Sequence, residues 1–121
     1  MILFSWNIRG LGRPENRKVV RNLVMSLKPQ LLFIQESKLN KFDSRVIKSL
    51  GGSILTSGMG VEATGSAGGL ITLRNEELFT VKTCISNDRS IILSRELVRL
   101  RKDVVFCNVY ATNRECERKE L

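Results

Sequence analysis

Short apolar runs frame one clear helical pattern at the start of the chain. Residues 2–6 and 31–34 are apolar on both alternations, which is typical of strands covered on both faces. Between them, apolar residues recur at helical spacing from Pro14 until Pro29 ends the pattern. The order predicts a β-α-β unit, in which two parallel strands are joined by a crossover helix.

The cations of this first predicted helix lie opposite its apolar face. They are Arg17, Lys18, Arg21 and Lys28. The simpler interpretation is a solvated helix face, and the alternative is a dedicated contact surface.

The second half of the chain has a strand pattern. A second helix is predicted over 42–50, where apolar residues share one face and a glycine supplies the stop. The stretch 58–68, rich in Gly, Ser and Thr, is predicted to be an exposed loop. Short β segments are predicted at 53–57, 69–74, 78–85, 90–100 and 104–110. This order indicates an α/β fold in which antiparallel strands follow the parallel unit.

The last predicted strand lacks cover. Residues 104–110 place apolar side chains on both faces, but only residues 111–121 follow, and 114–121 are mostly charged. Two helices suffice for one side of a sheet. We therefore expect the missing layer to come from a partner or from sequence that is absent here.

Composition limits the class of protein. A chain of 121 residues is one domain at most, and 42% hydrophobic with 26% charged residues is typical of a soluble globular protein. No apolar run approaches the roughly 20 residues that span a bilayer, and the start has no signal-peptide pattern. We therefore expect an intracellular protein with no membrane partner.

Cysteine and histidine counts exclude several chemistries. The three cysteines include no CxxC pair, and the sequence has no histidine, so neither a disulfide framework nor a zinc site is expected. A mechanism that uses an imidazole cannot be completed by this chain alone.

The net charge is strongly positive. A value of +8 with a pI near 9.9 suits a polyanionic partner, and nucleic acid is the first expectation. A generically basic soluble domain is the alternative. Salt-sensitive affinity would indicate phosphate contacts.

Polar residues follow the two predicted parallel strands. Asn7 and Glu36 would lie at one edge of the sheet, because parallel strands end side by side. A carboxylate there can bind Mg²⁺, which keeps several waters, and an amide can donate to a phosphate oxygen. The hydroxyl of Tyr110, after a later strand, can stabilise charge on phosphorus. The alternatives are a strand-end carboxylate, a turn amide and a tyrosine at the core edge.

Four short motifs follow one another along the chain, at 5–11 (SWNIRGL), 35–37 (QES), 68–71 (GGLI) and 108–113 (NVYATN). Their order and spacing resemble the endonuclease/exonuclease/phosphatase superfamily. The chain looks most similar to the apurinic-type endonuclease domain of plant non-LTR (LINE-type) retrotransposons. The resemblance covers residues 1–121 but only the first half of the family's domain.

The resemblance implies an α/β fold, the N-terminal portion of a four-layer α/β sandwich with two packed mixed sheets and outer helices. It implies that Glu36 is the ligand of a catalytic Mg²⁺ or Mn²⁺ and that Asn7 lies beside the metal and phosphate. By the same resemblance Tyr110 and Asn113 contact the phosphate. Thr112 stands where the family usually has proline, so the shape of that turn departs from the family's pattern.

The family's later motifs, a GDxN pattern and a terminal SDH, have no counterpart here. They carry its water-activating and charge-stabilising residues, and each such term is worth about two to four powers of ten in rate. We therefore expect a truncated relative of a metal-dependent DNA endonuclease that is inactive alone and whose missing half could come from another chain. The resemblance also implies the nucleus.

Three alternatives stay open. The chain could be a basic nucleic-acid-binding module without catalysis, or a fragment of a phosphatase of the same fold. It could also be a fragment that does not fold alone, because its sheet would expose apolar surface.

Overall fold

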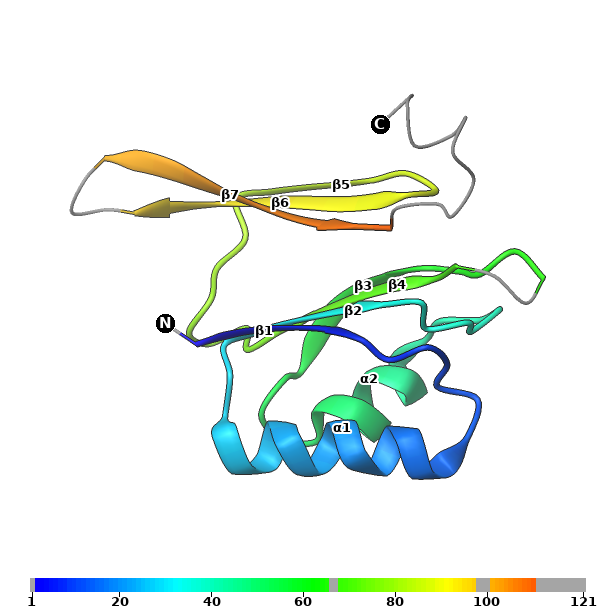
Figure 1. Cartoon of the computed structure of the whole chain (residues 1–121). Helices are drawn as coiled ribbons and strands as arrows, with labels where there is room; N and C mark the ends of the chain where they lie inside the picture. Colours follow the sequence, from blue (N-terminus) through cyan, green and yellow to red (C-terminus); the bar gives the residue numbers. More distant parts are fainter. Residues whose placement is uncertain (1, 66–67, 98–100, 111–121) are drawn as a thin grey trace.

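The first two strands form the predicted parallel pair. In the computed structural model, which describes residues 2–65, 68–97 and 101–110, strand β1 (Leu3–Asn7) pairs with β2 (Leu31–Gln35). Helix α1 (Pro14–Leu27) makes the crossover between them (Figure 1). Asn7 is the register partner of Gln35, so the two strands end together.

Two antiparallel strands complete this first sheet. Strand β4 (Leu70–Arg74) lies beside β2, and β3 (Ser57–Val61) lies beside β4, which gives the order β1-β2-β4-β3. The second helix, α2 (Ser44–Gly51), begins at Asp43, whose carboxylate accepts hydrogen bonds from two backbone N–H groups of its first turn. Its presence confirms the predicted second helix.

The loop predicted at 58–68 was wrong for its first residues, because 58–61 belong to strand β3. A Cβ at Gly60 would overlap the Phe42 ring, and one at Gly58 would meet the Thr72 carbonyl oxygen at 2.6 Å. These glycines permit close packing rather than a turn. The strand predicted at 53–57 was also wrong, since a turn follows α2 and pairing starts only at Ser57.

A second, wholly antiparallel sheet follows. Its strands are β5 (Thr83–Ser86), β6 (Ser90–Leu97) and β7 (Lys102–Val109), in that order. The predicted strand 78–85 began too early, because Phe79 closes a turn by donating its N–H to the Asn75 carbonyl. Residues 98–100 of the predicted strand 90–100 lie outside the described residues.

The elements stack as helices, first sheet and second sheet (Figure 1). One core lies between the helices and the first sheet, around Val20, Val24 and Ile34. A smaller core lies between the sheets, where the rings of Phe79 and Phe106 meet edge to face at a centroid distance of 5.4 Å. The α/β architecture with two packed sheets and outer helices is therefore confirmed. Neither helix of the described chain is long and apolar enough to cross a membrane.

Two strands are less covered than their sequences predict. Strand β2 is buried on both faces as expected, but β1 is an edge strand, and Leu3 is 41% exposed. Strand β7 is also an edge strand, and only its inward side is covered. Val105 is 62% exposed on its outer side, as is Ile85, at 66%, on β5. The cause is the same in both sheets, because within the described residues no layer covers these sides.

One buried amide ties the sheets together. The Oδ1 of Asn108, on β7, accepts a hydrogen bond from Gln35 Nε2 at 2.8 Å. Its Nδ2 donates to the Ile71 carbonyl at 3.0 Å and to the Thr72 hydroxyl at 3.2 Å. Asn108 is 1% exposed, and across the described residues no buried side-chain polar atom is left unpaired. Both ends of one side chain thus hold the first sheet.

Replacing Asn108 by leucine should destabilise the protein by about 3 kcal/mol, because leucine keeps the size but leaves several buried polar groups unpaired. Urea unfolding, followed through the single tryptophan, Trp6, measures this. Cys107→Ser, an outward change on the same strand, is the control and should stay within about 0.5 kcal/mol of wild type. Equal losses in both variants would contradict the role given to Asn108.

Candidate phosphate-binding cleft

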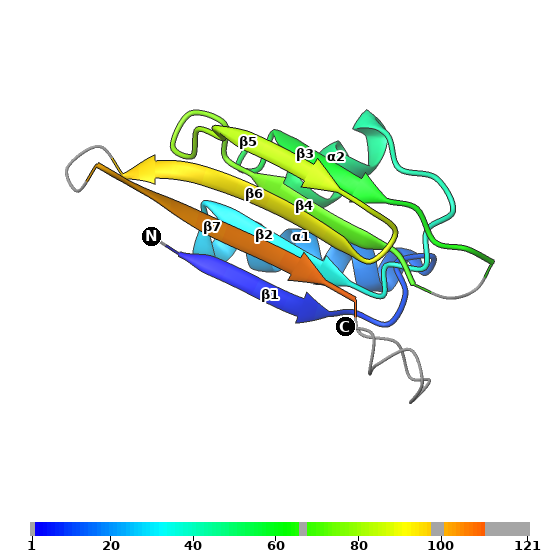
Figure 2. The ribbon, with the colours of Figure 1, turned by 90° about the horizontal axis from the view of Figure 1, so that it is seen from above.

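A cleft of about 410 Å³ opens where three strands end. Strands β1, β2 and β7 run in the same direction, and their C-terminal ends lie at the same end of the molecule (Figure 2). The cleft lies between the two sheets there. Its polar lining consists of Ser5, Asn7, Gln35, Glu36 and Tyr110.

The structure brings three of the four predicted site residues together. Asn7, exposed at the end of β1, and Glu36, half-buried just after β2, are joined by Tyr110, half-buried just after β7. Asn113 lies outside the described residues, as does Thr112. Their roles toward metal and phosphate stay predictions.

Glu36 is held in an unusual backbone conformation. Its φ of 53° lies in the left-handed region, which non-glycine residues rarely adopt. The preceding loop fixes it, because Gly10 N–H donates to the Glu36 carbonyl at 2.8 Å and Leu11 N–H donates to the Ser37 carbonyl at 2.8 Å. Such conformations persist when the surroundings over-determine them, and here the residue that adopts one lines the cleft.

A glycine pair supports the same turn from the other side. Ser37 N–H donates to the Gly69 carbonyl at 3.1 Å, and Lys38 N–H donates to the Gly68 carbonyl at 2.9 Å. Gly69 has a φ of +93°, and a Cβ there would overlap the Ser37 hydroxyl. A Cβ at Gly68 would lie 3.8 Å from the Tyr110 ring. The GGLI motif therefore accepts backbone hydrogen bonds from the turn at Glu36 and lies next to the Tyr110 ring.

The sequence alone did not identify the residues that join the strands below the cleft. Gln35 Nε2 donates to Ser5 Oγ at 3.0 Å as well as to Asn108, so it joins β1, β2 and β7 below the cleft. Gln35 and Asn108 both stood in recognised motifs, but neither received a role. The sequence feature that could have identified them is a polar side chain within an apolar strand, because a buried polar side chain needs a hydrogen-bond partner.

The cleft offers few ligands to a metal. Glu36 supplies one carboxylate, and within 2–65, 68–97 and 101–110 no group of three acidic, histidine or cysteine side chains could hold an ion. Mg²⁺ accepts one or two carboxylates when phosphate oxygens and water fill its other positions. These residues therefore fit an ion that a phosphate helps to hold, rather than a resident one.

A second hollow, of about 240 Å³, lies between the sheets near β3 and β5. Cys84 lines it and donates its S–H to Met59 Sδ at 3.4 Å. Burial raises the pKa of the Cys84 thiol, although Arg74 opposes this. At neutral pH the side chain is thus a thiol and a poor nucleophile.

Comparisons with known proteins give the fold. No protein-family model matches the sequence, and no curated protein is significantly similar to it. The structure is similar to the AP endonuclease LMAP from Leishmania major, with a TM-score of 0.70 and 19% identity, over 90% of this chain and 40% of that one. It is also similar to the APE2 catalytic domain from Xenopus laevis, with a TM-score of 0.61 and 15% identity, over 99% of this chain and 48% of that one.

The chain thus has the fold of these AP endonuclease structures and spans less than half the length of either one. At these identities the comparisons show the fold alone. The branch of plant LINE-type retrotransposons stays a prediction.

Replacing Gly69 by alanine should cost more than about 2 kcal/mol of stability, because the new Cβ adds left-handed strain to an overlap with Ser37. Gly12→Ala is the matched control, since nothing lies within 4 Å of a Cβ there, and it should change stability by less than about 0.5 kcal/mol. Urea unfolding of both variants tests this. Equal stabilities would show that the glycine pair does not constrain the turn.

Proposed function

We propose that this chain is a relative of divalent-metal-dependent DNA endonucleases, derived from a retrotransposon, that binds a phosphodiester without hydrolysing it. The observation that carries the proposal is the meeting of Asn7, Glu36 and Tyr110 in one cleft at the ends of three strands. The nuclease fold of the similar structures supports DNA as the partner. The nucleus is proposed from the sequence resemblance alone.

Each residue of the cleft has a defined task in this proposal. The Asn7 amide and the Tyr110 hydroxyl donate to non-bridging phosphate oxygens. Glu36 would hold Mg²⁺ or Mn²⁺, and that ion, when bound, offsets negative charge on the phosphate. Gln35 joins β1 and β7 and so keeps the two donors on opposite walls. Asn113 is proposed as a further phosphate contact from the segment after β7.

The proposed lack of turnover rests on what the residues cannot do. Hydrolysis needs a group that activates water and one that stabilises developing charge, and the sequence has no histidine. The single carboxylate of the cleft is already committed to the metal. The GDxN and SDH motifs that supply these groups in the family have no counterpart in the sequence, and another chain that carries them is a proposed partner.

A binding module that ignores metal is the second candidate. The observation that favours it is the net charge of +8, which attracts DNA whatever the cleft contributes. Metal dependence separates the two candidates.

Glu36→Gln should have opposite effects on DNA affinity with and without metal. In Mg²⁺ the variant should bind a labelled duplex about tenfold more weakly, because the metal loses its ligand. In EDTA it should bind slightly more tightly, because a negative charge beside the phosphate is gone. Fluorescence anisotropy measures both affinities.

Glu77→Gln is the matched control, since it makes the same charge change at an exposed site away from the cleft, and it should show no such reversal. Wild-type affinity that is indifferent to Mg²⁺ would favour the binding module.

Neither wild type nor Glu36→Gln should nick supercoiled plasmid in Mg²⁺ or Mn²⁺. The assay needs protein that is soluble and monodisperse. Nicking by the wild type that disappears in Glu36→Gln would contradict the proposed inactivity.

A further inference from the structure

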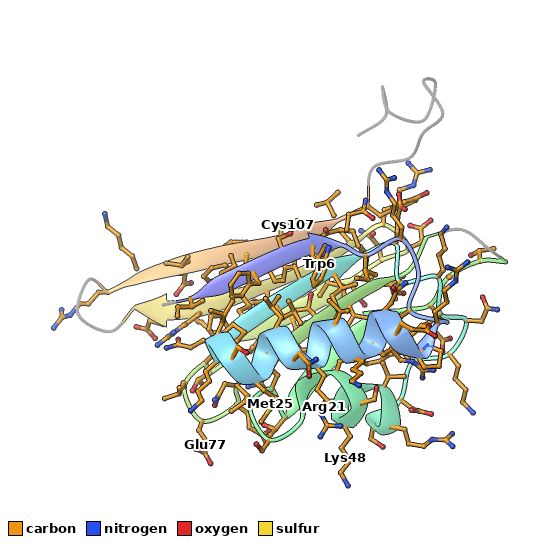
Figure 3. All side chains as sticks on the ribbon, turned by 60° about the horizontal axis from the view of Figure 1, so that its bottom comes forward. Trp6, Arg21, Met25, Lys48, Glu77 and Cys107 are labelled. Atoms are coloured by element: carbon orange, nitrogen blue, oxygen red, sulfur yellow. The ribbon has the colours of Figure 1, made fainter. Side chains whose placement is uncertain are left out.

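A groove of about 620 Å³ runs between α1 and α2, on the face of the first sheet that the second sheet does not cover. Arg21 and Met25 line it from α1, and Arg45 and Lys48 line it from α2. Figure 3 shows Arg21 and Lys48 on the same side of the molecule, away from Cys107. We propose that this groove is a second contact surface for the phosphate backbone of DNA, separate from the cleft.

The charge of the groove is largely uncompensated. Arg45 forms a surface ion pair with Asp43 at 3.1 Å, and its side chain is 82% exposed. Among the described residues no carboxylate lies within 4.0 Å of the charged groups of Arg21 or Lys48. Two unpaired cations from different helices therefore border one concave surface.

Helix stabilisation accounts for only part of this charge. Gly52, with a φ of +56°, ends α2, and a Cβ there would lie 3.8 Å from Arg21 Nε and 3.3 Å from Met25 Sδ. The Arg21 guanidinium thus lies against the negative end of α2, and Lys48 lies in its last turn. A helix end carries only about half a negative charge, which is less than either cation supplies. The remaining positive potential is available to a ligand.

The arrangement suits a linear polyanion. Arg17 and Arg21 are spaced four residues apart, which places them on one side of α1 and extends the positive charge beyond the groove. Met25, 42% exposed, adds an apolar surface that can contact sugar. A row of cations with a small apolar floor fits a phosphodiester backbone better than a compact anion. The identity of the polyanion as DNA rests on the proposed function.

The groove variant is Arg21→Gln/Lys48→Gln, and its control is Arg101→Gln/Lys102→Gln, which removes the same charge from exposed positions at the start of β7. Both are compared with wild type by anisotropy of a labelled duplex in EDTA, where the cleft has no metal. The salt concentration runs from about 50 to 200 mM.

The groove variant should bind about tenfold more weakly at the lowest salt. Its slope of log affinity against log salt should be shallower by roughly 1.8, which corresponds to two lost phosphate contacts at about 0.9 each. The control should keep the wild-type slope. Arg21→Lys/Lys48→Arg keeps the charge and should restore binding, which separates charge from any change in folding.

Three outcomes would overturn the proposal: equal losses in groove and control variants, no loss in either, or displacement of the duplex by polyglutamate as effective as by unlabelled duplex at equal charge. The Glu36→Gln comparison in Mg²⁺ reports on the cleft alone. The proposal for the groove can therefore be rejected while the proposal for the cleft is supported, and the reverse.

Discussion

Four hydrogen bonds converge on the buried Asn108 side chain and join the two sheets. Asn108 accepts from Gln35 Nε2 and donates to the carbonyls of Ile34 and Ile71 and to the Thr72 hydroxyl. The Asn108 side chain, on β7, forms hydrogen bonds with both β2 and β4, and Gln35 extends this connection to Ser5 on β1. The apolar core between the sheets is the smaller of the two cores, and this polar link adds a specific register to its packing. The position of Tyr110 across from Glu36 follows from it, because Tyr110 is two residues beyond Asn108.

Local patterns were enough to predict the parallel unit and the edge on which Asn7 and Glu36 meet. Strand runs, a helix period and the rule that parallel strands end together are all readable from neighbouring residues. The strand at Gly58 and Gly60 could not be predicted in this way. Phe42 and β4 pack closely against these glycines, and those contacts form only when the chain folds. Which side of an edge strand is left bare likewise depends on what packs above it.

The two surfaces proposed for DNA differ in how they were found. Motifs identified the cleft, and the structure adds the backbone contacts that hold the Glu36 turn. The groove between the helices could not be predicted from the sequence, because a solvated face was the simpler interpretation of the cations of α1. Only the position of α2, with Lys48 beside Arg21, turns that face into one wall of a concave surface. Charge along one helix becomes informative when a second helix is placed against it.

The bare outer side of the second sheet bears on how the protein behaves in solution. Ile85, Val105 and Val109 are exposed there, and mutual repulsion between molecules of charge +8 opposes contact between such faces. Salt shortens the range of that repulsion to about 10 Å at 0.1 M and less above it. We therefore expect that high salt, which would weaken the proposed binding of DNA, also promotes self-association, and light scattering across a salt series would detect it. The positive charges that keep the molecules apart are the same charges that would attract nucleic acid, so salt weakens both effects together.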